Sequence, residues 1–493
     1  MNPQRDGVPR RNHVSDRRAH DARRSICHNK KGCIALKTTT SVIALSLLGF
    51  AGLAEARSDS HDYLPLTLRE NNAQAEASGF IEGQSLSGST RNWYSRERAT
   101  KGPLYRYYKS DGTRQATHSR DNWVQGTILD YSSGFTQGPV GLGLQVAGYN
   151  AIALEQGRAA VAGPNNRTLT HSDGEVIGQW SKLGLANIKA RVSNTTLTAG
   201  RQSIDTPVFA FIGNRALPSS FDGISLHSAE LDNLTFDLGS FDRVSTRTEQ
   251  GKSRFTTEYS ATGVTADRVT LAGFNYQPLR SLTTSLYFAN VEDIWNQYYF
   301  GASHDLGDSS VLGLTTGLNY YGTRDTGSSR QGPIDNDTFS LSFALTHQAH
   351  TFTVAYQEVA GNEYFDYVHD TNAIFLANSL FSDFNGPNEK SLQFAYVLNM
   401  AGYGLPGLRL NVYTARGWGI DGTHYRGNGY DVRNLDGEHH REWGIGAGYT
   451  VQDGALKNTA IRATYSAHRA SRAQIDGNVD ELRIVTTIPF NIL

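Results

Sequence analysis

Short segments in which apolar and polar residues alternate recur along the chain, and this period of two limits the folds that it can adopt. In residues 338–346, Phe339, Leu341 and Phe343 alternate with Ser340 and Ser342. The same pattern occurs in residues 139–146, 350–357 and 390–398. A period of two is that of a β-strand with one apolar and one polar face. The sequence therefore predicts an all-β fold of many strands.

Periodicity alone leaves two all-β folds open. In a soluble sandwich the apolar face of each strand forms the core and the polar face meets water. In a transmembrane barrel the apolar face meets lipid and the polar face lines the lumen. Other features of the chain must decide between them.

Residues 37–56 have the features of a secretory signal peptide: an apolar run follows lysines and ends at an Ala-Glu-Ala site. We expect cleavage after Ala56. Residues 1–36 form an Arg-rich N-terminal extension, which is either an artefact of an upstream translation start, the reading we favour, or part of the protein. No other stretch approaches about 18 consecutive apolar residues, which excludes a helical membrane protein.

The composition of residues 57–493 narrows the classes further. Both cysteines, Cys27 and Cys33, precede this part, so it has no disulfide and no thiolate metal site. Its formal net charge is −7 and no basic stripe stands out, so nucleic acid is not an expected partner. No cofactor and no metal ion are expected either.

Three features favour the barrel: the chain is exported, it is too long for one sandwich, and aromatic residues crowd the predicted strand ends, where interfacial girdles would lie. These aromatic groups are Trp93-Tyr94, Tyr287-Phe288, Tyr298-Tyr299-Phe300 and Tyr320-Tyr321. At roughly 24 residues per strand and connection, residues 57–493 give about 18 strands. We therefore predict a transmembrane antiparallel β-barrel in the outer membrane of a Gram-negative bacterium.

The alternation stops between Ala199 and Leu226, where turn residues bracket the apolar residues 208–212. Loops longer than about 12–15 residues are uncommon unless they are functional. In a barrel, such a loop suggests a segment folded inward across the pore, with Arg215 at its centre. An ordinary exposed loop is the alternative.

The strand period also places basic side chains in the lumen. Arg483 lies opposite the apolar residues of the last strand, and a charge on the lipid face near the midplane would cost about 2–4 kcal/mol. By the same alternation, we expect Arg462, Lys189 and Arg191 to face inward, toward the space that Arg215 would occupy. For each, a solvated lumen charge with no special role is the alternative.

Matching motifs are spread over strands, loops and the C-terminus: Gly79–Glu82, Trp123–Gly126, Asp130–Gly138, Ala349–Thr353, Ile374–Ser379, Ser382–Pro387 and Asn491–Leu493. Through them, residues 79–493 resemble the porin D (OprD) family of outer-membrane porins. The resemblance implies a monomeric 18-stranded barrel narrowed by an inward loop, inserted by the barrel-assembly machinery and surrounded by lipid and lipopolysaccharide. It also implies passive uptake of small carboxylate-bearing nutrients. In the porin D subgroup these are basic amino acids, small peptides that contain them, and carbapenem antibiotics that mimic them; neutral or aromatic carboxylates are the alternative.

In that subgroup a row of basic side chains lines one side of the constriction and an electronegative pocket lies opposite. The resemblance assigns the basic row to Arg120, Arg215, Arg462 and Arg483, and the pocket to Tyr259, Tyr367, Ser379 and Asp383. The basic row is incomplete, since Gly448 replaces a lysine and Thr464 an arginine, and the match near residues 96–98 is ambiguous. One pocket tyrosine is Phe381. A turn-capping role is the alternative for Asp383, because residues 382–387 are rich in turn formers.

An enzyme is the main rival class. Relatives have been described as peptidases with a histidine, an aspartate and a serine, and here Asp293 matches the aspartate while Ser240 and Ala373 replace the other two. No G-x-S-x-G, H-E-x-x-H or Walker motif is present. We therefore expect no catalytic residue. A soluble secreted β-protein, such as a lectin, is a third reading.

Overall fold

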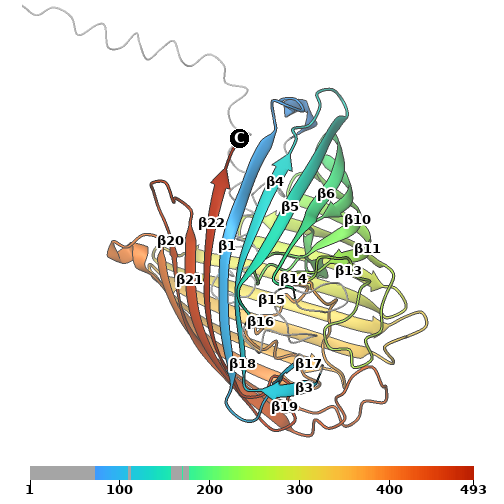
Figure 1. Ribbon diagram of the computed structural model, residues 1–493, viewed down its shortest axis with the longest axis vertical. Coiled ribbons are helices and arrows are strands. Elements are labelled where there is room, and N and C mark those ends of the chain that lie inside the picture. Colours follow the sequence, from blue (N-terminus) through green and yellow to red (C-terminus); the bar gives the residue numbers. More distant parts are fainter. Residues whose placement is uncertain (1–72, 109–112, 157–168, 170–176) are drawn as a thin grey trace, which may run out of the picture. The chain divides into compact units, whose positions relative to one another are not determined.

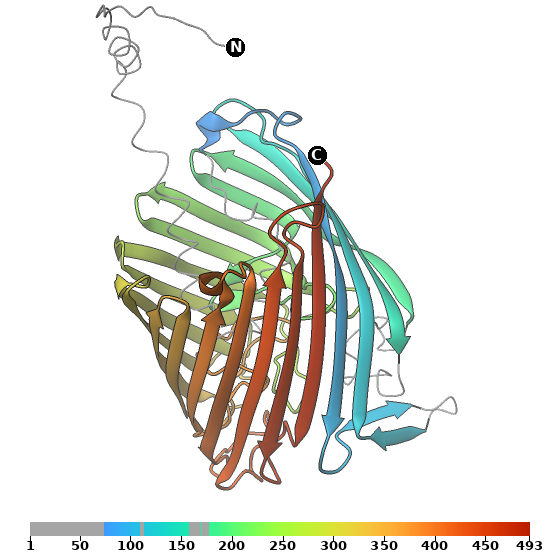
Figure 2. The same cartoon turned by 90° about the vertical axis from the view of Figure 1, so that its left-hand side faces the viewer.

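The computed structural model describes residues 73–108, 113–156, 169 and 177–493, and its main feature is a closed antiparallel barrel. Eighteen strands form one sheet, in which the first strand, β1, pairs with β4 on one side and with the last strand, β22, on the other. The ring of strands is visible in Figures 1 and 2. The predicted fold class and strand number are confirmed. The predicted extension and signal peptide lie outside the described residues.

The strands of the barrel, in chain order, are β1 (Ser85–Ala99), β4 (Ser119–Ser132), β5 (Gly141–Gln156), β6 (Gln179–Val192), β7 (Thr195–Gln202), β10 (Ser220–Leu231), β11 (Leu234–Ser245), β12 (Val269–Leu279), β13 (Leu282–Val291), β14 (Trp295–Asp308), β15 (Leu312–Asp325), β16 (Asp335–His347), β17 (His350–Ala360), β18 (Lys390–Asn399), β19 (Leu408–Ile420), β20 (Glu438–Thr450), β21 (Ala460–Ala470) and β22 (Val479–Asn491). Shorter elements are β2 (Tyr105–Tyr108), β3 (Arg114–Thr117), β8 (Asp205–Thr206), β9 (Phe209–Ala210) and the 3-10 helices η2 (Gln74–Glu76) and η5 (Met400–Tyr403). Among the described residues, no helix is long and apolar enough to cross a membrane.

The apolar face of each strand points away from the barrel interior. In β16, Leu341, Phe343 and Leu345 are exposed, whereas Ser340 and Ser342 are at most 3% exposed. A soluble protein buries the apolar face and exposes the polar one, so this arrangement is the reverse. It is stable where lipid covers the outer face, which excludes the soluble β-protein.

The two ends of the barrel differ in the length of their connections. At the end where β1 begins and β22 finishes, neighbouring strands are joined by short turns, such as residues 193–194 and 348–349. The other end carries long connections, including residues 203–219, 246–268 and 361–389. In outer-membrane barrels the short turns face the periplasm and the long loops face the outside, so the long loops mark the extracellular end.

The aromatic prediction was half right, because neighbouring residues on a strand face opposite sides. Trp93, Tyr299 and Tyr321 are buried inside the barrel rather than in a girdle. Tyr298 and Tyr320 lie on the outer face. Outward aromatic residues pair directly across four neighbouring strands, as Phe288 with Tyr298, Phe300 with Tyr320, and Tyr320 with Phe339.

The connection between β7 and β10 folds into the lumen, as predicted, but it is shorter than expected. Residues 199–202 end β7 and residues 220–226 begin β10, because main-chain pairing between the two strands continues up to Gln202 and Phe221. The loop is therefore residues 203–219. We call it the constriction loop.

Contacts on opposite sides of the barrel show that the constriction loop crosses the lumen. On one side, Tyr321 of β15 donates a 2.9 Å hydrogen bond to the Pro207 carbonyl. On the other side, Nη1 of Arg91 on β1 donates to the Gly213 carbonyl at 2.7 Å. A Cβ at Gly126 of β4 would lie 2.2 Å from the Ala216 carbonyl oxygen, so a side chain there would displace the loop.

Other long loops pack against the constriction loop inside the barrel. Residues from the 246–268, 361–389 and 421–437 loops join it in one buried apolar cluster, which includes Phe255, Phe365 and Val432. Phe211 also forms a β-bridge with Thr371. Several loops with a shared apolar core thus pack together inside the barrel.

Candidate functional site

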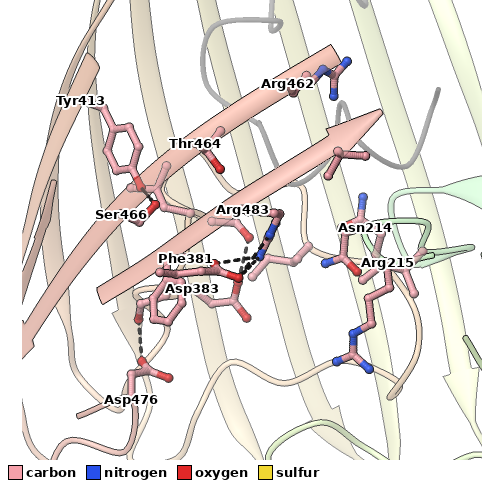
Figure 3. A pocket seen from close by; sticks show the side chains of 18 of the residues that line it. Asn214, Arg215, Phe381, Asp383, Tyr413, Arg462, Thr464, Ser466, Asp476 and Arg483 are labelled. Atoms are coloured by element: carbon pink, nitrogen blue, oxygen red, sulfur yellow. Dashed lines mark hydrogen bonds and ion pairs between the residues drawn. The ribbon is translucent and has the colours of Figure 1, made fainter. Parts of the chain in front are cut away.

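A cavity of about 270 Å³ lies inside the barrel, bounded by the constriction loop, the 361–389 loop and inward residues of β1, β18, β19, β21 and β22. We call it the lumen cavity. Seven of the eight predicted site residues line it: Arg215, Arg462, Arg483, Tyr259, Tyr367, Ser379 and Asp383. Figure 3 shows Arg462 and Arg483 on neighbouring strands, with Arg215 apart from them on the loop.

The acidic side of the lumen cavity is organised around Asp383. Tyr259 and Tyr367 each donate a 2.8 Å hydrogen bond to Oδ2, and Ser379 donates one to Oδ1 at 2.8 Å. Burial raises the pKa of the Asp383 carboxyl, although the three hydroxyl donors oppose that shift. The four residues come from the 246–268 and 361–389 loops, so loop packing assembles this group.

Burial, together with the Asp383 carboxylate, raises the pKa of Tyr259 and Tyr367 well above the ordinary tyrosine value. Both hydroxyls therefore keep their protons and remain donors. The rings of Tyr259 and Tyr364 stack at 4.8 Å, which fixes the orientation of one of these donors. The three hydroxyl donors therefore hold the Asp383 carboxylate in one orientation.

The basic side of the lumen cavity combines strand and loop residues. Arg462 on β21 and Arg483 on β22 face inward, as the strand period predicted. Arg215 is held through its own backbone, because Nη1 of Arg91 donates to the Arg215 carbonyl at 3.2 Å. The adjacent Asn214 accepts a 2.6 Å hydrogen bond from Arg247, which also donates to Asp370.

Sequence reasoning missed several charged residues of the cavity. Glu481 accepts hydrogen bonds from Arg483 at 2.9 and 3.1 Å and partly neutralises it. This partner was detectable, because residues two apart on a strand share a face. Asp476 and Arg247 also line the cavity, but both lie in irregular connections, where no period points to them.

The positions where the chain departs from the family pattern lie at the same site. Thr464 and Phe381 line the lumen cavity, and Gly448 pairs with Arg462 across β20 and β21. A Cβ at Gly448 would meet only the Arg462 side chain, at 3.7 Å. The smaller or uncharged residues therefore leave room on the basic wall.

Arg120 does not line the lumen cavity. It is buried near the extracellular end of β4, donates to Glu97 Oε2 from Nε at 2.9 Å, and lies 4.5 Å from the Tyr105 ring centre. The expectation that Lys189 and Arg191 share a space with Arg215 was wrong. Arg191 lies on the Phe135 ring and donates to Gln74 near the periplasmic end, because it stands at the last inward position of β6.

Comparison with known proteins places this geometry in a family. The family model described as outer membrane porin, OprD family, matches residues 78–492. The chain belongs to the OprD family of outer-membrane porins. Within this family it is 38% identical to Porin D of Pseudomonas aeruginosa over 433 residues, which cover 85% of this chain and 94% of that protein.

Solved OprD-family structures show the same barrel. OccD3 (OpdP) of P. aeruginosa is 49% identical, with a TM-score of 0.76, and the match covers 86% of this chain and 95% of that one. OpdK of P. aeruginosa, solved with vanillate, is 27% identical with a TM-score of 0.72, over 84% and 100% of the two chains. This chain is therefore a channel-forming outer-membrane protein.

The residue proposed from peptidase-like relatives lies outside the lumen cavity. Asp293 stands in the short β13–β14 turn with a positive φ of 61°, and Arg330 donates to its Oδ2 at 2.7 Å. The backbone N–H of Ser328 donates to its other oxygen at 3.1 Å. These contacts give Asp293 a role in holding a turn.

Proposed function

We propose that this OprD-family porin takes up basic amino acids and small peptides that contain them, and that carbapenem-type antibiotics share the route. One observation supports the proposal above the others: basic residues and the half-buried Asp383, with its hydroxyl donors, line the same cavity. A basic amino acid carries a carboxylate and extra positive charge. The arginines can bind the carboxylate of such a solute while Asp383 binds its positive charge.

The narrow lumen strengthens this selection. Two unit charges 4 Å apart interact by about 1 kcal/mol in bulk water and by about 4 kcal/mol at the effective dielectric near a protein surface. A solute must also leave, so several weak sites in series conduct better than one tight site. Arg483 is one such weak site, because its hydrogen bonds to Glu481 reduce its attraction for a solute carboxylate.

Neutral or aromatic carboxylates are the second candidate. Gly448 and Thr464 leave fewer basic side chains along the lumen, and Phe381 lacks the hydroxyl of the pocket tyrosine that it replaces. Both changes favour a bulkier or less charged solute. OpdK, which was solved with vanillate, an aromatic carboxylate, has the same fold. The chain is not proposed as an enzyme, because Asp293 holds a turn outside the cavity.

We infer that the barrel acts as a monomer that the barrel-assembly machinery inserts. Lipid and lipopolysaccharide surround its apolar outer face. This inference follows the family and concerns assembly only. Solute selection within the lumen of one barrel does not require a second copy.

Swelling of proteoliposomes in lysine, arginine, leucine, glutamate and benzoate tests the substrate class. We expect Asp383→Asn to slow lysine and arginine uptake about 5- to 10-fold, because a charged partner of the substrate cation is lost. Leucine uptake should stay nearly unchanged. Asp232→Asn, in the periplasmic β10–β11 turn, is the matched control.

Equal slowing of lysine and leucine would show that Asp383 only shapes the loop. Faster uptake of benzoate than of lysine by the wild-type porin would favour the second candidate. Both measurements use the same vesicles, so differences in insertion cancel when rates are expressed as ratios.

A further inference from the structure

Two histidines and an aspartate meet at the edge of the lumen cavity, outside the group around Asp383. His440 of β20 and His468 of β21 are buried, and Asp476 lies in the β21–β22 loop. One ligand atom of each residue lies within 4.8 Å of the others. Figure 3 shows Asp476 beside the cavity that it helps to line.

Hydrogen bonds fix which nitrogen of each imidazole carries the proton. His440 Nε2 lies 2.5 Å from the carboxylate oxygen Oε1 of the buried Glu389. His468 Nδ1 lies 2.7 Å from the Gly477 carbonyl oxygen. Both oxygens only accept when Glu389 is ionised, so these two nitrogens carry the protons.

The same assignment leaves the other two nitrogens with lone pairs that face each other. His440 Nδ1 and His468 Nε2 are 2.7 Å apart. Two lone pairs at this distance repel unless a positive charge lies between them. A proton on one ring, which makes an N–H···N hydrogen bond at this distance, satisfies the pair, and so does a metal ion.

The surroundings also match those of a metal site. In protein metal sites each histidine usually donates its outer N–H to a carboxylate or a backbone carbonyl, which orients the ring. The Glu389 carboxylate accepts from His440 Nε2, and the Gly477 carbonyl accepts from His468 Nδ1. Asp476 adds a carboxylate: Ser382 and Gln474 both donate to its Oδ2, at 2.6 and 2.8 Å, which leaves Oδ1 available as a ligand.

We propose that His440 Nδ1, His468 Nε2 and Asp476 Oδ1 bind a divalent transition-metal ion, with Zn²⁺ as the best fit. Two imidazoles and a carboxylate are a zinc ligand set, and a fourth position is left open. Zn–N bonds of about 2.0–2.1 Å in tetrahedral geometry separate the nitrogens by about 3.3 Å, so a small movement of the rings admits the ion.

Ser382 Oγ, which donates to Asp476, lies 3.5 Å from His440 Nδ1 and therefore stands next to the fourth position. Ser382 and Asp476 both line the lumen cavity, so a hydroxyl, a water or a solute carboxylate reaches the fourth position from there. A bound ion also joins β20 and β21 to the β21–β22 loop. It adds positive charge to the acidic side of the lumen.

Calorimetric titration of the metal-free porin in detergent with ZnCl₂ tests the site. We expect one Zn²⁺ per chain, and a tetrahedral visible spectrum when Co²⁺ is used instead. His468→Gln should abolish binding. Glu389→Gln, which removes the partner that orients His440, should weaken it by about 10–100-fold.

The control is His350→Gln, a histidine whose ring nitrogens lie 2.7 and 3.0 Å from the hydroxyls of Tyr396 and Tyr403 at the periplasmic end. It should bind Zn²⁺ like the wild type. Asp476→Asn tests the site without disturbing a buried ring, and should weaken binding at least about tenfold. Heat-dependent migration on SDS gels checks that each variant folds.

Absence of stoichiometric Zn²⁺ in the wild type would overturn the proposal and leave a shared proton as the explanation for the histidine pair. Undiminished binding by both His468→Gln and Asp476→Asn would overturn it as well. Neither measurement depends on the substrate. Failure of the zinc site is therefore distinct from failure of the proposed uptake function.

Discussion

Arg215 and Arg120 carry the same charge in different surroundings, and the difference decides what each contributes. Arg215 is half-buried at the lumen cavity, where solutes pass. Arg120 is buried against Glu97, which is itself fully buried. A basic residue at a lumen acts on solutes, whereas a buried partner of a carboxylate acts on stability.

Arg215→Gln should therefore reduce carboxylate uptake and make the channel more cation-selective, because it removes positive charge where little water screens it. Reversal potentials in planar bilayers under a salt gradient measure this. Lys457→Gln, in a periplasmic turn, is the charge-matched control and should shift the potential less. An unchanged reversal potential in Arg215→Gln would mean that another element sets the selectivity.

Arg120→Gln should instead destabilise the barrel by about 3–5 kcal/mol, because it removes the guanidinium that pairs with the buried Glu97 carboxylate. The temperature at which the folded band disappears on SDS gels reports this. Replacing both residues, as Arg120→Gln with Glu97→Gln, should recover most of the loss. Equal stability of single and double variants would contradict a coupled pair.

Gly448→Lys should restore a basic residue to the wall. The glycine does not have a left-handed backbone, and a Cβ there would meet only the Arg462 side chain, at 3.7 Å, so the backbone accepts a side chain at this position. We expect a shift toward anion selectivity that shrinks in high salt. A shift of the same size at all salt concentrations would point to a change in shape rather than in charge.

At the scale of elements, the strand faces and the inward fold of the constriction loop were predictable, whereas the contacts between loops were not. The period of two predicted that Arg462 and Arg483 face inward. In a membrane-spanning barrel the apolar face meets lipid, so the opposite face of each strand must face the lumen. The contacts of Asp476, Arg247 and Asp370 depend on loops whose sequence has no period. Their placement follows from apolar packing inside the barrel, which no local pattern encodes.

The 246–268 and 361–389 loops are also joined by charge. His369 Nδ1 lies 2.5 Å from Glu258 Oε2. Burial opposes the charged form of each residue, yet the partner raises the pKa of His369 above 6.5 and lowers that of Glu258 below 4.5. Both residues are charged between pH 4.5 and 6.5, so the ion pair stabilises the contact between the two loops most in this range.

Stability from protonated His369 is complete below its ordinary pKa of 6.5 and is lost as pH rises through the raised value. The Glu258 contribution is lost as pH falls through the lowered value. Hydrogen exchange of residues 361–389 should therefore speed up at alkaline pH, beyond the intrinsic rate increase. His369→Gln should remove this extra pH dependence, and an identical profile in the variant would rule out the pair as its cause.

For the whole molecule, closure of the sheet predicts that the barrel resists unfolding by SDS. Each of the 18 barrel strands is paired with two neighbours, so the described barrel exposes no strand edge to lipid. The porin should extract only with detergent, stay folded in cold SDS, and migrate differently after boiling. A chain truncated after Asn478, which lacks β22, should give no heat-dependent band.

The pairing of β1 with β22 also limits how such channels change in evolution. The strands are antiparallel, and the end of β22 returns to the start of β1, where the Ile492 N–H donates to the Leu86 carbonyl at 2.8 Å. A single added or lost strand would bring the last strand to the wrong end and leave it parallel to the first. Descendants that keep this antiparallel closure can therefore widen or narrow the pore only by whole hairpins, whereas substitutions in the loops inside it change its chemistry one residue at a time.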